Sequence, residues 1–251
     1  MTGNIEQELA QILFGSLRIG AALLFAPAFT ASRVPASIRV LASLSIGLLA
    51  APCIPALPRA GVGLLLAGAG ELIIGGAIGF AAQIGLMAVA FAGEMIAAAL
   101  GLSFATLFDP ANGHATAVGE LFKLLGVYLF FAFGGHAAMV EAVFTSYRVF
   151  PVDSVAPLDG LAWPLVVLTG KAIEAGVMIA LPMVTAMLGI NMIAGFVTRT
   201  APQLNMFAIA IPMTLVAGLL ALLLFADGWV AASGSAVERL TGDGFAIFGA
   251  R

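Results

Sequence analysis

Residues 61–108 run almost without a charge, since only Glu71 and Glu94 interrupt them. A membrane-spanning helix needs about 20 mostly apolar residues. The run is therefore too long for one span, and it is too apolar for a surface that faces water. It ends in turn chemistry over residues 102–113. We expect a pair of membrane helices that leads into an apolar loop, an arrangement typical of a gate.

The composition places the chain among membrane proteins. Hydrophobic residues make up 62% of the chain and charged residues 9%, whereas soluble domains carry about 25% charged residues. Lipid or protein must therefore cover the outside. The net charge of -3, without a Lys/Arg run, argues against nucleic acid as a partner. The single Cys53 excludes an intrachain disulfide.

The apolar segments predict an all-α, polytopic membrane protein with about six long apolar helices in hairpins, broken helices and an inserted loop. Proline-containing turns separate these segments, and proline ends helices. We expect residues 85–104 to form a seventh span or a helix that does not span. Residues 1–230 are predicted to form a single helical domain, and residues 231–251 a short, exposed, partly mobile tail. The segments are 9–25, 38–51, 62–84, 85–104, 121–147, 165–197 and 207–230.

The first residues carry Glu6 and Glu8 but no basic residue, which is the wrong charge for a cleavable signal peptide. The first apolar segment is therefore expected to stay in the protein. Basic residues divide evenly between the two sides of a six-span arrangement, so the positive-inside rule gives no orientation. Either one span is misplaced, or the helices pack into an assembly rather than into an ordinary bilayer.

Small residues recur at four-residue spacing. Gly75 and Gly79 form one pair, and Gly93, Ala97 and Gly101 form a second row. Such spacing lets two helix backbones approach closely in apolar surroundings. The contact could lie within the chain or with another subunit.

The charges inside the apolar segments need partners, because a charge at mid-membrane is costly. Each lysine lies three residues from a glutamate, which favours local neutralisation; the pairs are Lys123 with Glu120 and Lys171 with Glu174. Arg18 has no acid within four residues. If its segment is buried, Arg18 needs an acid from another helix, for which Glu71, Glu94 and Glu141 are candidates. The alternative is that Arg18 extends to water.

Sequence signatures of enzymes are missing. The chain has no phosphate-binding GxxxxGK[ST] loop, no HExxH and no GxSxG. Its two histidines, His114 and His136, stand far apart, and one cysteine does not complete a metal site. We therefore expect no catalytic residues, no metal and no cofactor.

Several motifs resemble the FliR family, the R subunit of the flagellar type III protein export gate. The resemblance covers essentially the whole chain, and its motifs occupy residues 71–80, 93–94, 101–110 and 199–207. It implies a multi-pass subunit in the bacterial inner membrane and the flagellar basal body. It also implies assembly with the P and Q export-gate subunits and with the export-switch subunit. Exported unfolded flagellar proteins and membrane lipid would be its other partners.

The resemblance also implies a plug, the segment from about residue 102 to 118, that closes the channel until export. Its apolar barrier would come from Phe104, Leu107 and Phe108. Turns at Asp109-Pro110 and Asn112-Gly113 would fold it into the pore. At a later helix break, Arg199, Pro202, Gln203 and Asn205 would hold neighbouring helices or the export-switch subunit.

Two other functions remain open at the level of the sequence. A secondary transporter of a small solute also uses broken helices, but it should show two similar halves and ionisable groups that converge at mid-depth. The injectisome counterpart of the same subunit is the second alternative. Contacts with other subunits or with other helices of the chain are expected for Arg18, Glu71, Gly75, Gly79 and Glu94.

Overall fold

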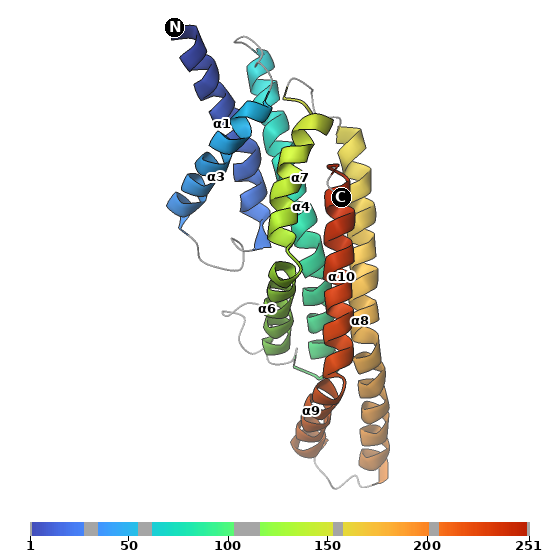
Figure 1. Cartoon of the computed structure of the whole chain (residues 1–251). Helices are drawn as coiled ribbons and strands as arrows, with labels where there is room; N and C mark the ends of the chain where they lie inside the picture. Colours follow the sequence, from blue (N-terminus) through green and yellow to red (C-terminus); the bar gives the residue numbers. More distant parts are fainter. Residues whose placement is uncertain are drawn as a thin grey trace. The chain divides into compact units, whose positions relative to one another are not determined.

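The structure is a computed structural model that describes residues 2–27, 35–54, 62–102, 116–152, 158–200 and 206–249. All regular structure within these ranges is helical (Figure 1), which confirms the predicted all-α class. The helices are α1 (Thr2–Phe25), α3 (Ala36–Ala50), the 3-10 helix η1 (Ala51–Cys53), α4 (Val62–Ala99), α6 (Ala117–Ala132), α7 (Gly135–Val149), α8 (Leu158–Thr200), α9 (Met206–Leu224) and α10 (Ala226–Ala246).

Two of the described helices are long and apolar enough to cross a membrane, Gly63–Ala99 within α4 and Gly160–Phe196 within α8. Two bent pairs reach this length together: α6 with α7, bent by 63°, and the Pro212–Leu224 part of α9 with α10, bent by 64°. The described part of the chain therefore supplies two to four candidate spans, as a polytopic membrane protein requires. The apolar parts of α1 and α3 are shorter.

The boundaries differ from the predicted segments in two places. Residues 62–84 and 85–104 were predicted as separate, but α4 runs through both as far as Ala99. No proline stands between them, and an isolated glycine such as Gly85 does not end a helix in apolar surroundings. By contrast, the predicted segment 121–147 is interrupted at Gly134, whose φ of 73° belongs to the left-handed region.

The prediction for residues 231–251 also needs correction. Residues 231–246 lie within α10, and Val237, Leu240, Phe245 and Phe248 are buried. The prediction of an exposed, partly mobile tail was wrong. These apolar residues recur at helical spacing among the glycines and polar residues, and so they form a buried stripe. The predicted single domain over residues 1–230 stays a prediction.

The chain divides into two compact units. The first unit contains Met1–Leu86, Phe130–Lys171 and Glu238–Arg251. Here α1 contacts α3, and Gln11 Nε2 donates a hydrogen bond of 2.9 Å to the Ile54 carbonyl. The first part of α4 supplies the fully buried Ile78, and the rings of Phe150 and Phe248 meet edge-on at 6.5 Å.

The second unit contains Met87–Leu129 and Ala172–Val237. Its centre is the fully buried Phe122 of α6, whose ring lies 4.7 Å from that of Trp229 in α10. The Trp229 indole donates a hydrogen bond of 3.0 Å to the Leu222 carbonyl of α9. This bond crosses the break between α9 and α10, so it satisfies a carbonyl that the broken helix leaves without its usual partner.

Candidate functional site

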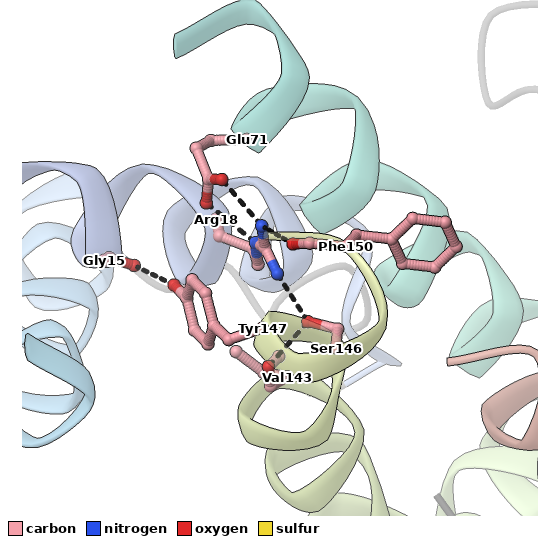
Figure 2. A network of polar contacts seen from close by, with 7 residues as sticks. All are labelled: Gly15, Arg18, Glu71, Val143, Ser146, Tyr147 and Phe150. Carbon is pink, nitrogen blue, oxygen red and sulfur yellow. Dashed lines mark hydrogen bonds and ion pairs between the residues drawn. The ribbon is translucent and has the colours of Figure 1, made fainter. Parts of the chain in front are cut away.

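The first unit holds a fully buried ion pair between Arg18 of α1 and Glu71 of α4 (Figure 2). The exposed fractions of the two side chains are 0% and 1%. Arg18 Nε donates to Glu71 Oε2 at 2.7 Å, and Nη2 donates to Oε1 at 2.6 Å. Glu71 is one of the three acids that the sequence offered, and the burial of Arg18 contradicts the alternative of a side chain that extends to water.

The same guanidinium also donates hydrogen bonds to the C-terminal end of α7. Arg18 Nη2 donates to the carbonyl of Phe150 at 2.9 Å, and Nη1 donates to the Ser146 hydroxyl at 2.9 Å. The Ser146 hydroxyl in turn donates to the Val143 carbonyl at 2.6 Å. The carbonyls at the end of a helix lack partners within the helix and carry partial negative charge. A buried cation is therefore well placed there.

Tyr147 completes the network (Figure 2). Its ring centroid lies 3.9 Å from Arg18 Cζ, within the range of a cation–π interaction. Its hydroxyl donates to the Gly15 carbonyl at 3.4 Å, which leads back to α1. One side chain of α1 is thus fixed to α4 and to α7 at once.

The chemistry of this network is that of a structural clamp. A buried ion pair gains stability only if its geometry is good and its remaining donors are satisfied. The geometry of the Arg18 pair is good, and the protein's own carboxylate, hydroxyl and carbonyls accept hydrogen bonds from four of its five N–H groups. Arginine keeps its charge under all ordinary conditions, so the pair holds three helices in one register.

The predicted glycine pair lies directly against α1. A Cβ at Gly75 would overlap the Arg18 carbonyl oxygen and lie 2.9 Å from Ala21 Cβ. A Cβ at Gly79 would overlap the Ala22 carbonyl oxygen and lie 2.9 Å from Phe25 Cβ. These two glycines therefore pack within the chain. Their close approach brings the two backbones near enough for Arg18 and Glu71 to meet.

The second small-residue row has a different environment. A Cβ at Gly93 would lie 2.5 Å from Phe122 Cβ, so this glycine lets α6 approach α4 within the second unit. Ala97 is fully buried. Gly101 has a φ of 78° and nothing within 4 Å of an added Cβ, so it serves to end the helix rather than to pack.

The end of α4 and the start of α6 are the two borders of the predicted plug, and hydrogen bonds hold both of them. The Leu102 amide donates to the Ala97 carbonyl at 3.0 Å, and the Gly101 amide donates to the Ala98 carbonyl at 3.0 Å. With a left-handed glycine, this pair of bonds is a Schellman motif, which satisfies the last carbonyls of α4.

Thr116 caps the other border. Its hydroxyl accepts a hydrogen bond of 3.0 Å from the Gly119 amide in the first turn of α6. The same hydroxyl donates to Glu94 Oε2 at 3.1 Å, and the Thr116 amide donates to Glu94 Oε1 at 3.4 Å. In a capping box, a glutamate of the same helix reaches this amide; here Glu94 does so from α4.

The predicted barrier and turn residues of the plug lie outside the described residues. So do three of the four residues predicted at the later helix break. These are Phe104, Leu107, Phe108, Asp109, Pro110, Asn112 and Gly113, and then Pro202, Gln203 and Asn205. The remaining residue, Arg199, is exposed in the last turn of α8.

The two lysines differ from each other. Lys123 pairs with Glu120 at 3.4 Å as predicted, with both side chains half exposed. Lys171 was predicted to pair with Glu174, but its Nζ lies 2.8 Å from Asp243 Oδ2 of α10. The prediction was wrong because the sequence shows only neighbours within one helix. Asp243 lies in α10, and only the packing of α10 against α8 places it beside Lys171.

Sequence reasoning missed Ser146, Tyr147, Phe150 and Thr116. Only Thr116 carried a usable signal, because a threonine immediately before an apolar helix is typical of an N-cap. Among the described residues, no group of three or more His, Cys, Asp or Glu could hold a metal ion. The absence of a cofactor stays a prediction.

The fold and these contacts define an all-helical membrane protein built around a buried arginine clamp, with a capped loop between α4 and α6. The sequence model of the bacterial export proteins, family 1, matches residues 9–240. The chain belongs to this family, which confirms the resemblance to FliR. The flagellar biosynthetic protein FliR of Pectobacterium carotovorum subsp. carotovorum is 33% identical over 220 residues, 85% of this chain and 83% of that protein.

Two further relatives match a similar share of this chain. FliR of Escherichia coli (strain K12) is 32% identical over 207 residues, covering 81% of this chain and 79% of that protein. FliR of Caulobacter vibrioides is 30% identical over 216 residues, covering 84% and 86%. The family match over residues 9–240 spans the Arg18 network and the α4–α6 loop alike.

Proposed function

We propose that the chain is a structural, pore-forming subunit of the flagellar type III export gate. The observation that carries the proposal is the family match over residues 9–240, together with relatives named for flagellar biosynthesis. The subunit would assemble with the P and Q subunits and the export-switch subunit in the inner membrane. Unfolded flagellar proteins would pass through the resulting channel, and the chain itself would catalyse no reaction.

The uneven burial of the two longest helices supports a place in an assembly. In the most apolar part of α4, 67% of the residues are buried, against 22% in α8. Large apolar side chains such as Met178, Leu188 and Phe196 are exposed along α8. Surfaces of this kind are covered by lipid or by other subunits.

The two fixed borders support the plug. A segment that closes a channel must be displaceable in its middle and held at its ends, because a loose end would let it leave the pore. Here the Schellman motif at Gly101 holds one end, and the Thr116–Glu94 contacts hold the other. The proposed plug spans residues 102–118, and its apolar residues would exclude ions until cargo displaces them.

The first test is a pull-down of the tagged chain from its native cells in a mild detergent, with partners identified by mass spectrometry. Recovery in a fixed complex with the P and Q subunits is the expected result. A lone chain or a simple homodimer, from cells that make those subunits, would overturn the proposal and favour the secondary transporter. Co-purification with injectisome subunits instead would assign the chain to that system.

The second test removes residues 108–113. The shortened loop should make the membrane permeable to small ions or molecules while the complex still assembles. Normal assembly with unchanged permeability after the loop deletion would contradict the plug assignment but leave the subunit assignment intact.

A further inference from the structure

The helices differ in the side chains that they expose. Each of the helices α1, α3, α4, α6, α8 and α9 exposes several large apolar side chains, as surfaces covered by lipid or by other subunits do. In α10 the only exposed side chain of this kind is Val230, at 37%, and in α7 it is Val149. All of α7 and residues 238–246 of α10 belong to the first unit. This unit therefore has exposed helix surface that is not apolar.

The exposed side of α10 in this unit carries charges. Glu238, Arg239 and Asp243 are exposed there, and an added Cβ at Gly242 would have nothing within 4 Å. Lys171 of α8 extends to the same side, since its Nζ lies 2.8 Å from Asp243 Oδ2 and both side chains are 52% exposed. Positions three or four apart share a side of a helix. These five residues therefore form one surface, which we call the charged face.

The charged face lies at the depth of the hydrocarbon core of a bilayer. Gly244, the next residue after Asp243, packs on α4, because an added Cβ there would lie 3.0 Å from Ala81 Cβ. Ala81 is the midpoint of the apolar span Gly63–Ala99, which has 37 residues. A crossing takes about 20 residues, so every crossing within this span includes Ala81. Asp243 is therefore level with the hydrocarbon wherever along α4 the bilayer begins.

Lipid is an unfavourable neighbour for the charged face. Charged side chains at this depth are costly unless they meet a partner or a water-filled cavity. The pair of Lys171 and Asp243 offsets part of this cost, but about half of each side chain remains exposed. A partner helix with an apolar surface would remove water from these groups without replacing its hydrogen bonds. Contact with water is therefore the favourable solution.

We propose that the charged face lies against the water of the export channel and forms part of its wall. The inference rests on the proposed pore-forming function, and it identifies the surface that a passing polypeptide meets. An unfolded chain has no internal partners for its backbone groups, so it needs a path that keeps them hydrated. The charged face contains two acidic and two basic residues. Their charges balance, so the wall would not retain cargo of either sign, as passage requires.

The accessibility of single cysteines tests this assignment. Cys53 is the only cysteine of the chain, so Cys53→Ser provides a background without its thiol. Gly242→Cys places a thiol on the charged face, and Gly189→Cys is the matched control on α8; an added Cβ has nothing within 4 Å at either position. Glu238→Cys is a second probe of the charged face, should Gly242→Cys fail to assemble.

Each variant is purified as the full complex, placed in lipid nanodiscs and treated with a sulfonated methanethiosulfonate, which does not enter lipid but reaches both ends of a channel. Gly242→Cys should react at least about tenfold faster than Gly189→Cys, because the reactive thiolate forms in water rather than in apolar surroundings. Equally slow reactions at the two positions would overturn the proposal, since they would show that lipid or another subunit covers the charged face.

A stalled cargo distinguishes the channel wall from a surface that meets bulk water. An exported flagellar protein fused to a tightly folded domain should remain in the channel and slow the reaction of Gly242→Cys about fivefold or more, since a chain that fills a pore excludes other solutes. If the fusion co-purifies but the rate is unchanged, the charged face does not line the channel. If the chain is recovered without the P and Q subunits, the proposed function fails, and this inference fails with it.

Discussion

Arg18 and Glu71 stand 53 positions apart in the sequence and form a two-point ion pair with no exposure to solvent at the arginine. The pair is possible because Gly75, one helical turn beyond Glu71, removes the Cβ that would overlap the Arg18 carbonyl. The close approach of two backbones and the pairing of two charges are therefore one feature of the fold. Losing either should weaken the other.

Neutralising one member of the pair should destabilise the chain strongly. Arg18→Met leaves Glu71 as a buried unpaired charge, and Glu71→Leu leaves Arg18 in the same condition, at a cost of about 3–5 kcal/mol each. The double variant should lose clearly less than the sum of the two. The measurement is the free energy of unfolding in mixed micelles with a denaturing detergent.

The matched control is the half-exposed pair of Lys123 and Glu120. Removing its charges should change the free energy of unfolding by less than about 1 kcal/mol. If the losses from Arg18→Met and Glu71→Leu prove strictly additive, the two residues do not interact directly and the clamp is wrong.

The sequence left open whether Arg18 pairs with an acid of another helix or extends to water, and for a pair it could not choose among Glu71, Glu94 and Glu141. All three acids interrupt apolar segments, and the choice depends on which helix packs on α1. Ser146 and the Phe150 carbonyl were beyond reach for the same reason, since they join the network only through the packing of α7. What periodicity and composition do predict is the helical class, the glycine pair at 75 and 79, and the border of the α4–α6 loop.

Glycine-to-alanine variants along α4 should separate close packing from helix propensity. Gly75→Ala introduces a methyl group into the Arg18 backbone and should cost about 1–3 kcal/mol, as overpacking does. Gly68→Ala meets nothing within 4 Å and should stabilise the helix by up to about 1 kcal/mol. Thermal unfolding of the two proteins in the same detergent makes the comparison. Equal shifts for both would show that α1 does not approach α4 at Gly75.

The break between α6 and α7 should depend on the backbone of Gly134 alone. Its φ is 73°, and an added Cβ would have nothing within 4 Å. Gly134→Ala should therefore cost about 1–2 kcal/mol through conformational strain, and Gly134→Asn should cost less, because asparagine tolerates this region. Gly170→Ala, in the interior of α8 with open space around it, is the control and should be neutral or stabilising. Equal stability of the alanine and asparagine variants at position 134 would argue that the break is not held in the left-handed conformation.

The capped border of the α4–α6 loop gives the last prediction. Thr116→Val keeps the shape of the side chain but removes the hydroxyl that joins Gly119 to Glu94. The first turn of α6 should then lose about 1 kcal/mol, so its amides should exchange with solvent roughly fivefold faster. Thr116→Ser keeps the hydroxyl and should exchange as the unchanged protein does. If the loop is the plug, Thr116→Val should also raise membrane permeability, because the cap is what holds that end of the loop to α4. Faster exchange without a leak would contradict the second part of the prediction, because it would show that the cap stabilises α6 but does not keep the pore closed.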